Sequence, residues 1–219
     1  MKNKNRYFLA ELIGSCFLVM IIVGSGLMAE NLTNDTAVML IANTLATGAG
    51  LFVLITVFAD VSGAHFNPFV SIAMTITGKL KKKLLPFYIF AQVLGCLIGV
   101  ALANFFFEHQ IFELSTKSRD GVYIFVSEII ATLGLIIIIF GSMKSGKITV
   151  AASVGLYITA GYWFTSSTSF ANPAVAIART FTESFTGISY LNTPFYIFAE
   201  LIGMLIAVFI AKKLFLEKY

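Results

Sequence analysis

Long apolar segments recur along this chain, and their length restricts the fold more than any other feature. Of the 219 residues, 58% are hydrophobic and only 12% are charged, whereas about a quarter of the residues of a soluble domain are charged. A helix needs about 20 apolar residues to cross a bilayer. Six segments come close to that length: Phe8–Met28, Val38–Phe58, Leu84–Phe106, Val122–Gly141, Ile148–Tyr162 and Pro194–Ile210. We therefore predict an all-α membrane protein with six transmembrane helices.

The basic residues divide unequally when the six spans alternate across the membrane. Twelve of the fifteen fall on one side, namely Lys2, Lys4, Arg6, Lys79, Lys81, Lys82, Lys83, Lys144, Lys147, Lys212, Lys213 and Lys218. Lys117, Arg119 and Arg179 fall on the other. Since positive charge is retained on the cytoplasmic side, we expect both termini to be cytoplasmic. Basic residues scattered over loops do not form a nucleic-acid-binding patch, so no nucleic-acid partner is expected.

Two stretches of the sequence repeat each other. Pro86–Gly95 reads PFYIFAQVLG and Pro194–Gly203 reads PFYIFAELIG, with seven of ten positions identical. Glu11 and Glu128 are separated by about as many residues as these two stretches are. The predicted repeats, about residues 6–106 and 121–212, each hold three spans, so the second must enter the membrane from the opposite side. Such inverted repeats are typical of transport proteins whose pathway lies at the repeat interface.

Two segments between the spans are too apolar for ordinary loops and too short to cross the bilayer. One reads VSGAHFNPFVSIAMTITG and follows the second span, and the other reads SSTSFANPAVAIARTF and follows the fifth. Irregular backbone at membrane depth is tolerated only where it is buried in protein or lines a water-filled cavity. We therefore predict two re-entrant half-helices that meet near the midplane.

Each re-entrant segment contains an Asn-Pro pair, Asn67-Pro68 in the first and Asn172-Pro173 in the second. Proline suits the first turn of a helix and asparagine the position before it, so each pair predicts a helix start. The N-terminus of each half-helix bears about half a positive charge. Two such ends at the midplane would repel cations and protons, while the amides donate hydrogen bonds to neutral solutes. The alternative, a simple turn signal, accounts poorly for two pairs at repeat-related positions.

The backbone before each asparagine is expected to be unwound and to present a ladder of carbonyl acceptors. The predicted ladder residues are Gly63, Ala64, His65, Thr168, Ser169 and Phe170. Carbonyls facing an apolar wall suit small, polar, uncharged molecules. The His65 side chain either braces its loop or senses pH, because histidine titrates near neutrality.

The sequence resembles the aquaporin and aquaglyceroporin family over essentially its whole length. The resemblance rests on SGAHFNP at Ser62–Pro68, ANPA at Ala171–Ala174 and the Ala10-Glu11 pair in the first span. It implies six tilted helices plus two half-helices, usually assembled as tetramers with one pore per subunit. A homotetramer in a bilayer is the assembly that the resemblance implies.

The chain departs from the family pattern at the constriction that selects solutes. Val175 stands where the family usually has an arginine, and Phe69 stands where alanine is usual. This variant of the second motif resembles a bacterial branch that includes channels associated with arsenic resistance. Arg179 lies one helical turn beyond Val175, about 5.4 Å further out, where it either lines the outer vestibule or anchors the extracellular loops. The resemblance places the constriction at Thr47, Ser169, Val175 and a fifth-span position between Ile158 and Ala160.

Three acidic residues, Glu11, Glu128 and Glu200, lie within predicted spans. Intramembrane carboxylates are candidate functional groups. In one interpretation Glu11 and Glu128 accept hydrogen bonds from the re-entrant backbone and brace it. In the other, all three form a proton relay in a proton-coupled secondary transporter. Glu200 pairs with Gln92 across the repeat, so it is the acid without an acidic counterpart.

The sequence favours a passive channel for water and small uncharged solutes, such as glycerol and arsenous acid or similar metalloid hydroxides. It contains no nucleophile–base pair or phosphate-binding loop, so an enzyme is not expected. Cys16 and Cys96 lie within spans and match no metal or redox spacing, so neither a metal nor another cofactor is expected. The short loops suggest a bacterial plasma membrane.

Overall fold

The computed structural model describes residues 2–216, which form eight α-helices connected by loops and short single turns. The six long helices are α1 (Lys2–Leu32), α2 (Thr36–Ser62), α4 (Leu85–Phe106), α5 (Val122–Ser142), α6 (Lys147–Phe164) and α8 (Thr193–Ala211). The two short ones are α3 (Pro68–Ile76) and α7 (Pro173–Arg179). The turns are η1 (Lys82–Leu84), η2 (Met143–Ser145) and η3 (Lys212–Leu216). The predicted fold class is confirmed; Lys218 lies outside the described residues.

Five of the long helices are long and apolar enough to cross a membrane, and α6 is the exception. The helix α6 has 18 residues, and its sequence mixes glycine, serine and threonine with the apolar residues. It packs between α2 and α5. The helix that is hardest to recognise by hydropathy alone is thus placed in the bundle by its contacts with α2 and α5.

Glycines allow the long helices to cross closely at repeat-related places. In the first half α4 crosses α1, and in the second α8 crosses α5. A methyl group on Gly95 would overlap the carbonyl of Leu12, and one on Gly203 would overlap that of Ile129. Small residues at such crossings let helix backbones approach within a membrane.

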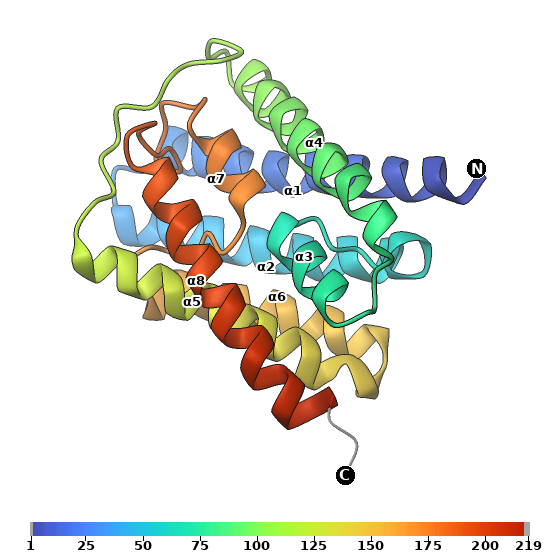
Figure 1. Ribbon diagram of the computed structural model, residues 1–219. Coiled ribbons are helices and arrows are strands. Elements are labelled where there is room, and N and C mark those ends of the chain that lie inside the picture. Colours follow the sequence, from blue (N-terminus) through green and yellow to red (C-terminus); the bar gives the residue numbers. More distant parts are fainter. Residues whose placement is uncertain (1, 217–219) are drawn as a thin grey trace.

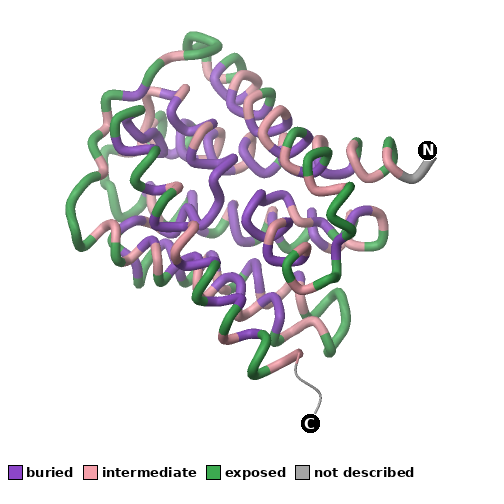
Figure 2. The backbone as a smooth tube through the Cα atoms, viewed as in Figure 1, coloured by how far each residue is buried: buried purple, intermediate pink, exposed green. Residues whose placement is uncertain are grey.

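The half-helices α3 and α7 lie among the long helices, as Figure 1 shows. They contact each other, and α7 also packs against α4 and α3 against α8. Figure 2 shows that buried residues concentrate on these inner elements, whereas exposed residues follow the loops and outer helix faces. Many exposed residues on the outer faces are large and apolar, including Phe90, Leu156, Phe198 and Phe209. Such a surface suits contact with lipid or with neighbouring apolar helices.

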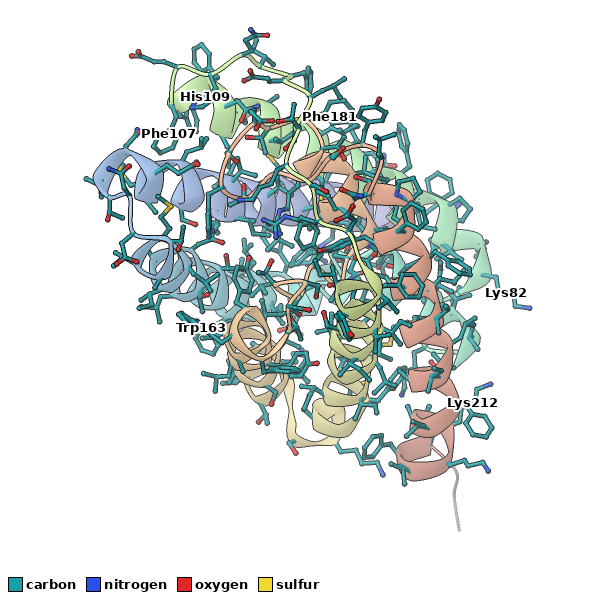
Figure 3. The ribbon with its side chains drawn as sticks, turned by 90° about the vertical axis from the view of Figure 1, so that its left-hand side faces the viewer. Lys82, Phe107, His109, Trp163, Phe181 and Lys212 are labelled. Atoms are coloured by element: carbon teal, nitrogen blue, oxygen red, sulfur yellow. The ribbon has the colours of Figure 1, made fainter. Side chains whose placement is uncertain are left out.

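The two ends of the molecule differ in charge. Lys82 and Lys212 lie at the end opposite to His109 and the long loop between α4 and α5 (Figure 3). At the lysine-rich end, Lys147 at the start of α6 forms an ion pair with Asp60 near the end of α2. Basic side chains are thus gathered at one end, in the pattern on which the orientation prediction rests.

Candidate transport pathway

Each half-helix begins at an asparagine that caps it. Asn67 Oδ1 accepts hydrogen bonds from the backbone N–H groups of Phe69 (2.9 Å) and Val70 (3.4 Å). Asn172 Oδ1 accepts from those of Ala174 (3.1 Å) and Val175 (3.4 Å). Pro68 and Pro173 occupy the first helical positions. Capping fixes each amide oxygen on its own helix, so the amide NH2 group points away from it.

The asparagine amides also join the two re-entrant segments. Asn67 Nδ2 donates to the carbonyl of Ala171 at 2.6 Å, and Asn172 Nδ2 donates to the carbonyl of Phe66 at 2.8 Å. Each amide has two N–H groups, so one remains for another acceptor. Both asparagines line the main cavity described below. The two asparagine amides can therefore each donate a hydrogen bond into that cavity.

The backbone before each asparagine is unwound. Ala64 and Phe66 in the first segment, and Ser169 and Ala171 in the second, have positive φ angles between 48° and 51°. Residues other than glycine rarely adopt positive φ angles, because each such residue costs about 1–3 kcal/mol. The surrounding structure must therefore hold these residues in place, and the hydrogen bonds below show how it does so.

Glu11 holds the first segment. Its Oε1 accepts from His65 N (3.0 Å) and Ser62 Oγ (2.6 Å), and its Oε2 accepts from Phe66 N (2.7 Å). Gln92 donates to the same Oε2 at 2.8 Å. The side chain of Glu11 is fully buried, so these donors replace water around the carboxylate. This arrangement fits the bracing interpretation of Glu11.

Two carboxyl groups hold the second segment. Glu128 accepts from Phe170 N at 3.3 Å and from Ala171 N. Glu200 Oε1 accepts from Asn172 N at 2.9 Å. All three intramembrane glutamates therefore bind re-entrant backbone, and none of them lines the main or the outer cavity described below.

The main cavity has a volume of about 410 Å³ and extends along the re-entrant segments. Its lining comes from α1, α2, α3, α5, α6, α7 and the unwound backbone. The helices α4 and α8 contribute no lining residue. Gly63, Ala64, His65, Ser169 and Phe170 of the predicted ladder line it. Thr168 lines a second, outer cavity instead. Apolar residues of the long helices, such as Leu51, Ile55, Leu135 and Val154, also line the main cavity.

Four of the five predicted constriction side chains line the main cavity, namely Thr47, Ile158, Ser169 and Val175. Ala160 does not: it is exposed on the outer face of α6. Because residues four apart share a helix face, Tyr162 follows Ile158 along the cavity. Tyr162 Oη lies 3.3 Å from Thr47 Oγ1. The fifth-span residue beside Thr47 is therefore Tyr162, which the sequence analysis missed.

Arg179 lies at the outer end of the pathway and is almost completely buried. Its Nε donates to the carbonyl of Thr186 at 2.5 Å, and its guanidinium carbon lies 3.4 Å from the centre of the Phe170 ring. This cation–π contact and the hydrogen bond hold the side chain in one position. Arg179 and Tyr162 line both the main and the outer cavity. The two residues thus stand at the junction between the cavities.

The outer cavity, of about 310 Å³, has a positively charged wall formed by Lys117, Arg119 and Arg179. Arg119 donates from Nε to Gly187 O (2.8 Å) and from Nη2 to Phe185 O (3.0 Å). Burial, together with repulsion from the two arginines, lowers the pKa of Lys117 to about 8. Lys117 is therefore mostly charged at pH 7 and loses its charge in mildly alkaline solution. A positive wall at this mouth disfavours cations.

His65 is held on both sides. Its Nδ1 lies 3.0 Å from Ser71 Oγ, and its ring centre lies 5.1 Å from that of Tyr88. Its own backbone N–H donates to Glu11 Oε1. These contacts favour the bracing interpretation of His65 over the pH-sensing one.

A cavity lined by opposed half-helices within a bundle of long apolar helices is the architecture of a multi-pass membrane channel. The chain belongs to the major intrinsic protein family, whose family model matches residues 1–210. It is 46% identical over 202 residues to the aquaglyceroporin AqpS of Rhizobium meliloti (strain 1021), an alignment covering 92% of this chain and 87% of that protein.

Other relatives extend the comparison. A probable TIP-type aquaporin of Medicago truncatula is 32% identical over 222 residues, which cover 95% of this chain and 86% of that protein. The X-ray structure of the aquaglyceroporin from Plasmodium falciparum superposes with a TM-score of 0.72 at 23% identity, covering 96% of this chain and 94% of that one. This structural likeness supports the fold described above.

Proposed function

We propose that this protein is a passive channel for water and small uncharged solutes, including glycerol, and that it excludes protons and ions. The observation that carries the proposal is the main cavity, which both asparagines line together with residues of the unwound backbone and apolar residues of the long helices. A solute hydroxyl can accept from an asparagine amide and donate to a carbonyl. Apolar carbons of the solute meet the opposite wall. The positive helix ends at the midplane disfavour cations and protons.

The constriction residues favour solutes wider than water. Val175 and Thr47 supply neither the fixed cation nor the aromatic bulk that the resemblance leads one to expect there. Tyr162 and Arg179 stand close by and line the same path. We place the filter at Thr47 and Val175, with Ser169 and Ile158 completing the wall and with Tyr162 and Arg179 beyond it. A neutral metalloid hydroxide such as arsenous acid presents several hydroxyls on a compact centre, so we include it among the proposed solutes.

A proton-coupled transporter is the competing proposal. It requires carboxyl groups that exchange protons with the pathway. Glu11, Glu128 and Glu200 instead face backbone N–H groups behind the cavity wall. Their positions favour a scaffold role, so the passive channel is the preferred interpretation.

We also propose a bacterial plasma membrane as the location and a homotetramer as the assembly, on the strength of the family and of the bacterial relative. The exposed apolar faces of the helices offer surface for subunit contact as well as for lipid. Cross-linking in the native membrane would test the tetramer directly.

The proposed function is tested by stopped-flow measurements on proteoliposomes. Wild-type vesicles should pass water, glycerol and arsenous acid down their own gradients, at rates that an imposed proton gradient leaves unchanged. Empty vesicles provide the control. Accumulation of a solute against its gradient when a proton gradient is imposed would overturn the channel proposal in favour of the transporter.

A further inference from the structure

We propose that Glu200 is protonated and shares its proton with Glu128. This carboxyl pair then holds the second re-entrant segment, as the amide–carboxylate pair of Gln92 and Glu11 holds the first. Glu200 is then a positioning residue for the transport pathway, and its proton is part of the structure. The proposal concerns the scaffold behind the cavity and holds whichever neutral solute the channel conducts.

The first half of the molecule shows what the arrangement requires. Gln92 on α4 donates from Nε2 to Glu11 Oε2 at 2.8 Å and to Ser71 Oγ at 2.9 Å. Glu11 in turn accepts from the backbone N–H groups of His65 and Phe66. The carboxylate therefore faces a permanent donor from α4, which an amide supplies.

The second half repeats these contacts with one chemical change. Glu128 accepts from Phe170 and Ala171, which follow His65 and Phe66 by 105 positions. Glu200 occupies the place of Gln92, 108 positions later. Its Oε1 accepts from Asn172 N, the residue directly after the two that Glu128 holds, so the two carboxyl groups bind neighbouring points of one re-entrant segment. An acceptor thus stands where the first repeat has a donor.

The remaining oxygen of Glu200 identifies where the proton sits. Among the described residues, Oε2 is buried without a hydrogen-bond partner. Glu128 and Glu200 are both fully buried, and two neighbouring carboxylates in such a place repel each other strongly. Ala176 occupies the position of Ser71, so that hydroxyl is missing as well. A proton on Oε2 converts it into a donor to Glu128 and removes one of the two charges.

Other charged or titratable groups act on this pair from the elements around it. The nearest cations are Arg179 at the end of α7 and Arg119 in the loop before α5. The phenols of Tyr157 on α6 and Tyr196 on α8 are also close to Glu128. The helix α3, which packs against α8, has no titratable residue. Both arginines donate to loop carbonyls, and within residues 2–216 neither forms an ion pair with Glu128 or Glu200. Their charge can balance the single negative charge that remains when the pair holds one proton.

Loss of that proton should affect the pathway. Glu200 holds the backbone of Asn172, and Glu128 holds the two residues before it. When both groups are ionised, their repulsion pushes apart the helices that fix these residues. We therefore expect solute flux to decrease in alkaline solution, because the second re-entrant segment loses its brace.

Infrared spectroscopy of the reconstituted protein tests the proton itself. The C=O stretch of a protonated carboxyl group is absent from a carboxylate. The wild type should show this band at neutral pH and Glu200→Gln should lack it, because the amide then donates permanently to an ionised Glu128. The reciprocal variant Gln92→Glu, which creates a second carboxyl pair at Glu11, should show a stronger band. A wild type without the band, or Glu200→Gln with it, would overturn the proposal.

The pH profile of glycerol flux tests the consequence, with equal pH on both sides of the vesicle membrane. Wild-type flux should fall at alkaline pH, whereas that of Glu200→Gln should stay nearly constant. Lys117 titrates in the same window but is present in both proteins, so it cannot produce a difference between them. Identical profiles would overturn the role of the proton in positioning. Only this second measurement rests on the proposed function, so a failure of the channel proposal leaves the infrared result intact.

Discussion

At the outer end of the pathway, the bulky side chains come from positions displaced along their helices. Val175 is small, and the bulk and positive charge near it are supplied by Tyr162 and Arg179, each one turn further out than the position expected. Arg179 is fixed by Thr186 and Phe170, so it cannot swing freely towards Val175. The width of the constriction at Val175 and Thr47 should therefore decide which solutes pass.

We predict that Val175→Arg combined with Thr47→Phe reduces glycerol and arsenous acid flux about tenfold, equivalent to about 1.4 kcal/mol in the barrier, with a smaller effect on water. The added guanidinium and ring occupy space that the solutes need. Stopped-flow light scattering gives both fluxes from the same vesicles. Arg179→Ala is the matched control and should change the ratio of glycerol to water flux only slightly. A wild type that excludes glycerol but admits it after Arg179→Ala would place the filter at Arg179 instead.

Single residues were predictable from the sequence where a backbone rule applies to them. Asn67 and Asn172 combine a strong capping preference with a following proline, so their place at the helix starts could be read directly. Tyr162 could not be found from its distance to the motifs, since a distance along the chain does not say which face of α6 a residue occupies. The spacing of Ala151, Val154, Ile158 and Tyr162, all buried, was the signal that would have found it.

Among the elements, the closest helix crossings depend on glycine. At the crossing of α5 and α8, Gly203 approaches the carbonyl of Ile129 so closely that no side chain fits between them. Glu128 and Glu200 project from the same two helices. The crossing thus also fixes the distance between the two carboxyl groups.

We predict that Gly203→Ala destabilises the protein by about 1–3 kcal/mol, because the methyl group forces the two helices apart. The measurement is the midpoint of thermal unfolding in detergent, which should fall. Gly24→Ala in α1 is a suitable control, since a methyl group there would lie 3.6 Å from its nearest neighbour, Phe107. That variant should unfold at the wild-type temperature or slightly above it. Equal midpoints for the two variants would contradict the close crossing.

The helices themselves were largely predictable, because apolar length and the Asn-Pro pairs mark their boundaries. The first span is the main difference, extending from Lys2 to Leu32 where the apolar run covers only Phe8–Met28. Polar residues at both ends continue the helix outside the apolar part. Hydropathy indicates which residues lie in the apolar part of the membrane. A helix can continue beyond that part into water, so its ends are not marked by hydropathy.

For the whole molecule, the opposed half-helices and the uneven lysines suggest a single orientation. We predict that a membrane-impermeant thiol reagent added outside intact cells labels Ser118→Cys and misses Lys82→Cys. Both positions are exposed, so access to the reagent depends on the side of the membrane. Labelling of Lys82→Cys after the cells are opened serves as the positive control. The reverse pattern would show that the termini face outwards.

The assembly of the halves was predictable from the repeat, but the contacts across them were not. Paired motifs indicated that the re-entrant segments meet. They did not indicate that each asparagine would donate to a carbonyl of the opposite segment, since this depends on the unwound φ angles of Phe66 and Ala171. The position of Arg119 at the outer cavity was not predicted for a similar reason, because it depends on loop carbonyls that only folding brings together.

These reciprocal midplane hydrogen bonds limit how the channel could be regulated. Widening or closing the centre would break the bonds from Asn67 to Ala171 and from Asn172 to Phe66 together, and each unpaired buried group would cost about 1–3 kcal/mol. The centre is therefore a fixed aperture. A gate, in a channel of this construction, belongs at a mouth, and the ion pair between Asp60 and Lys147 joins two helix ends beside the lysine-rich one.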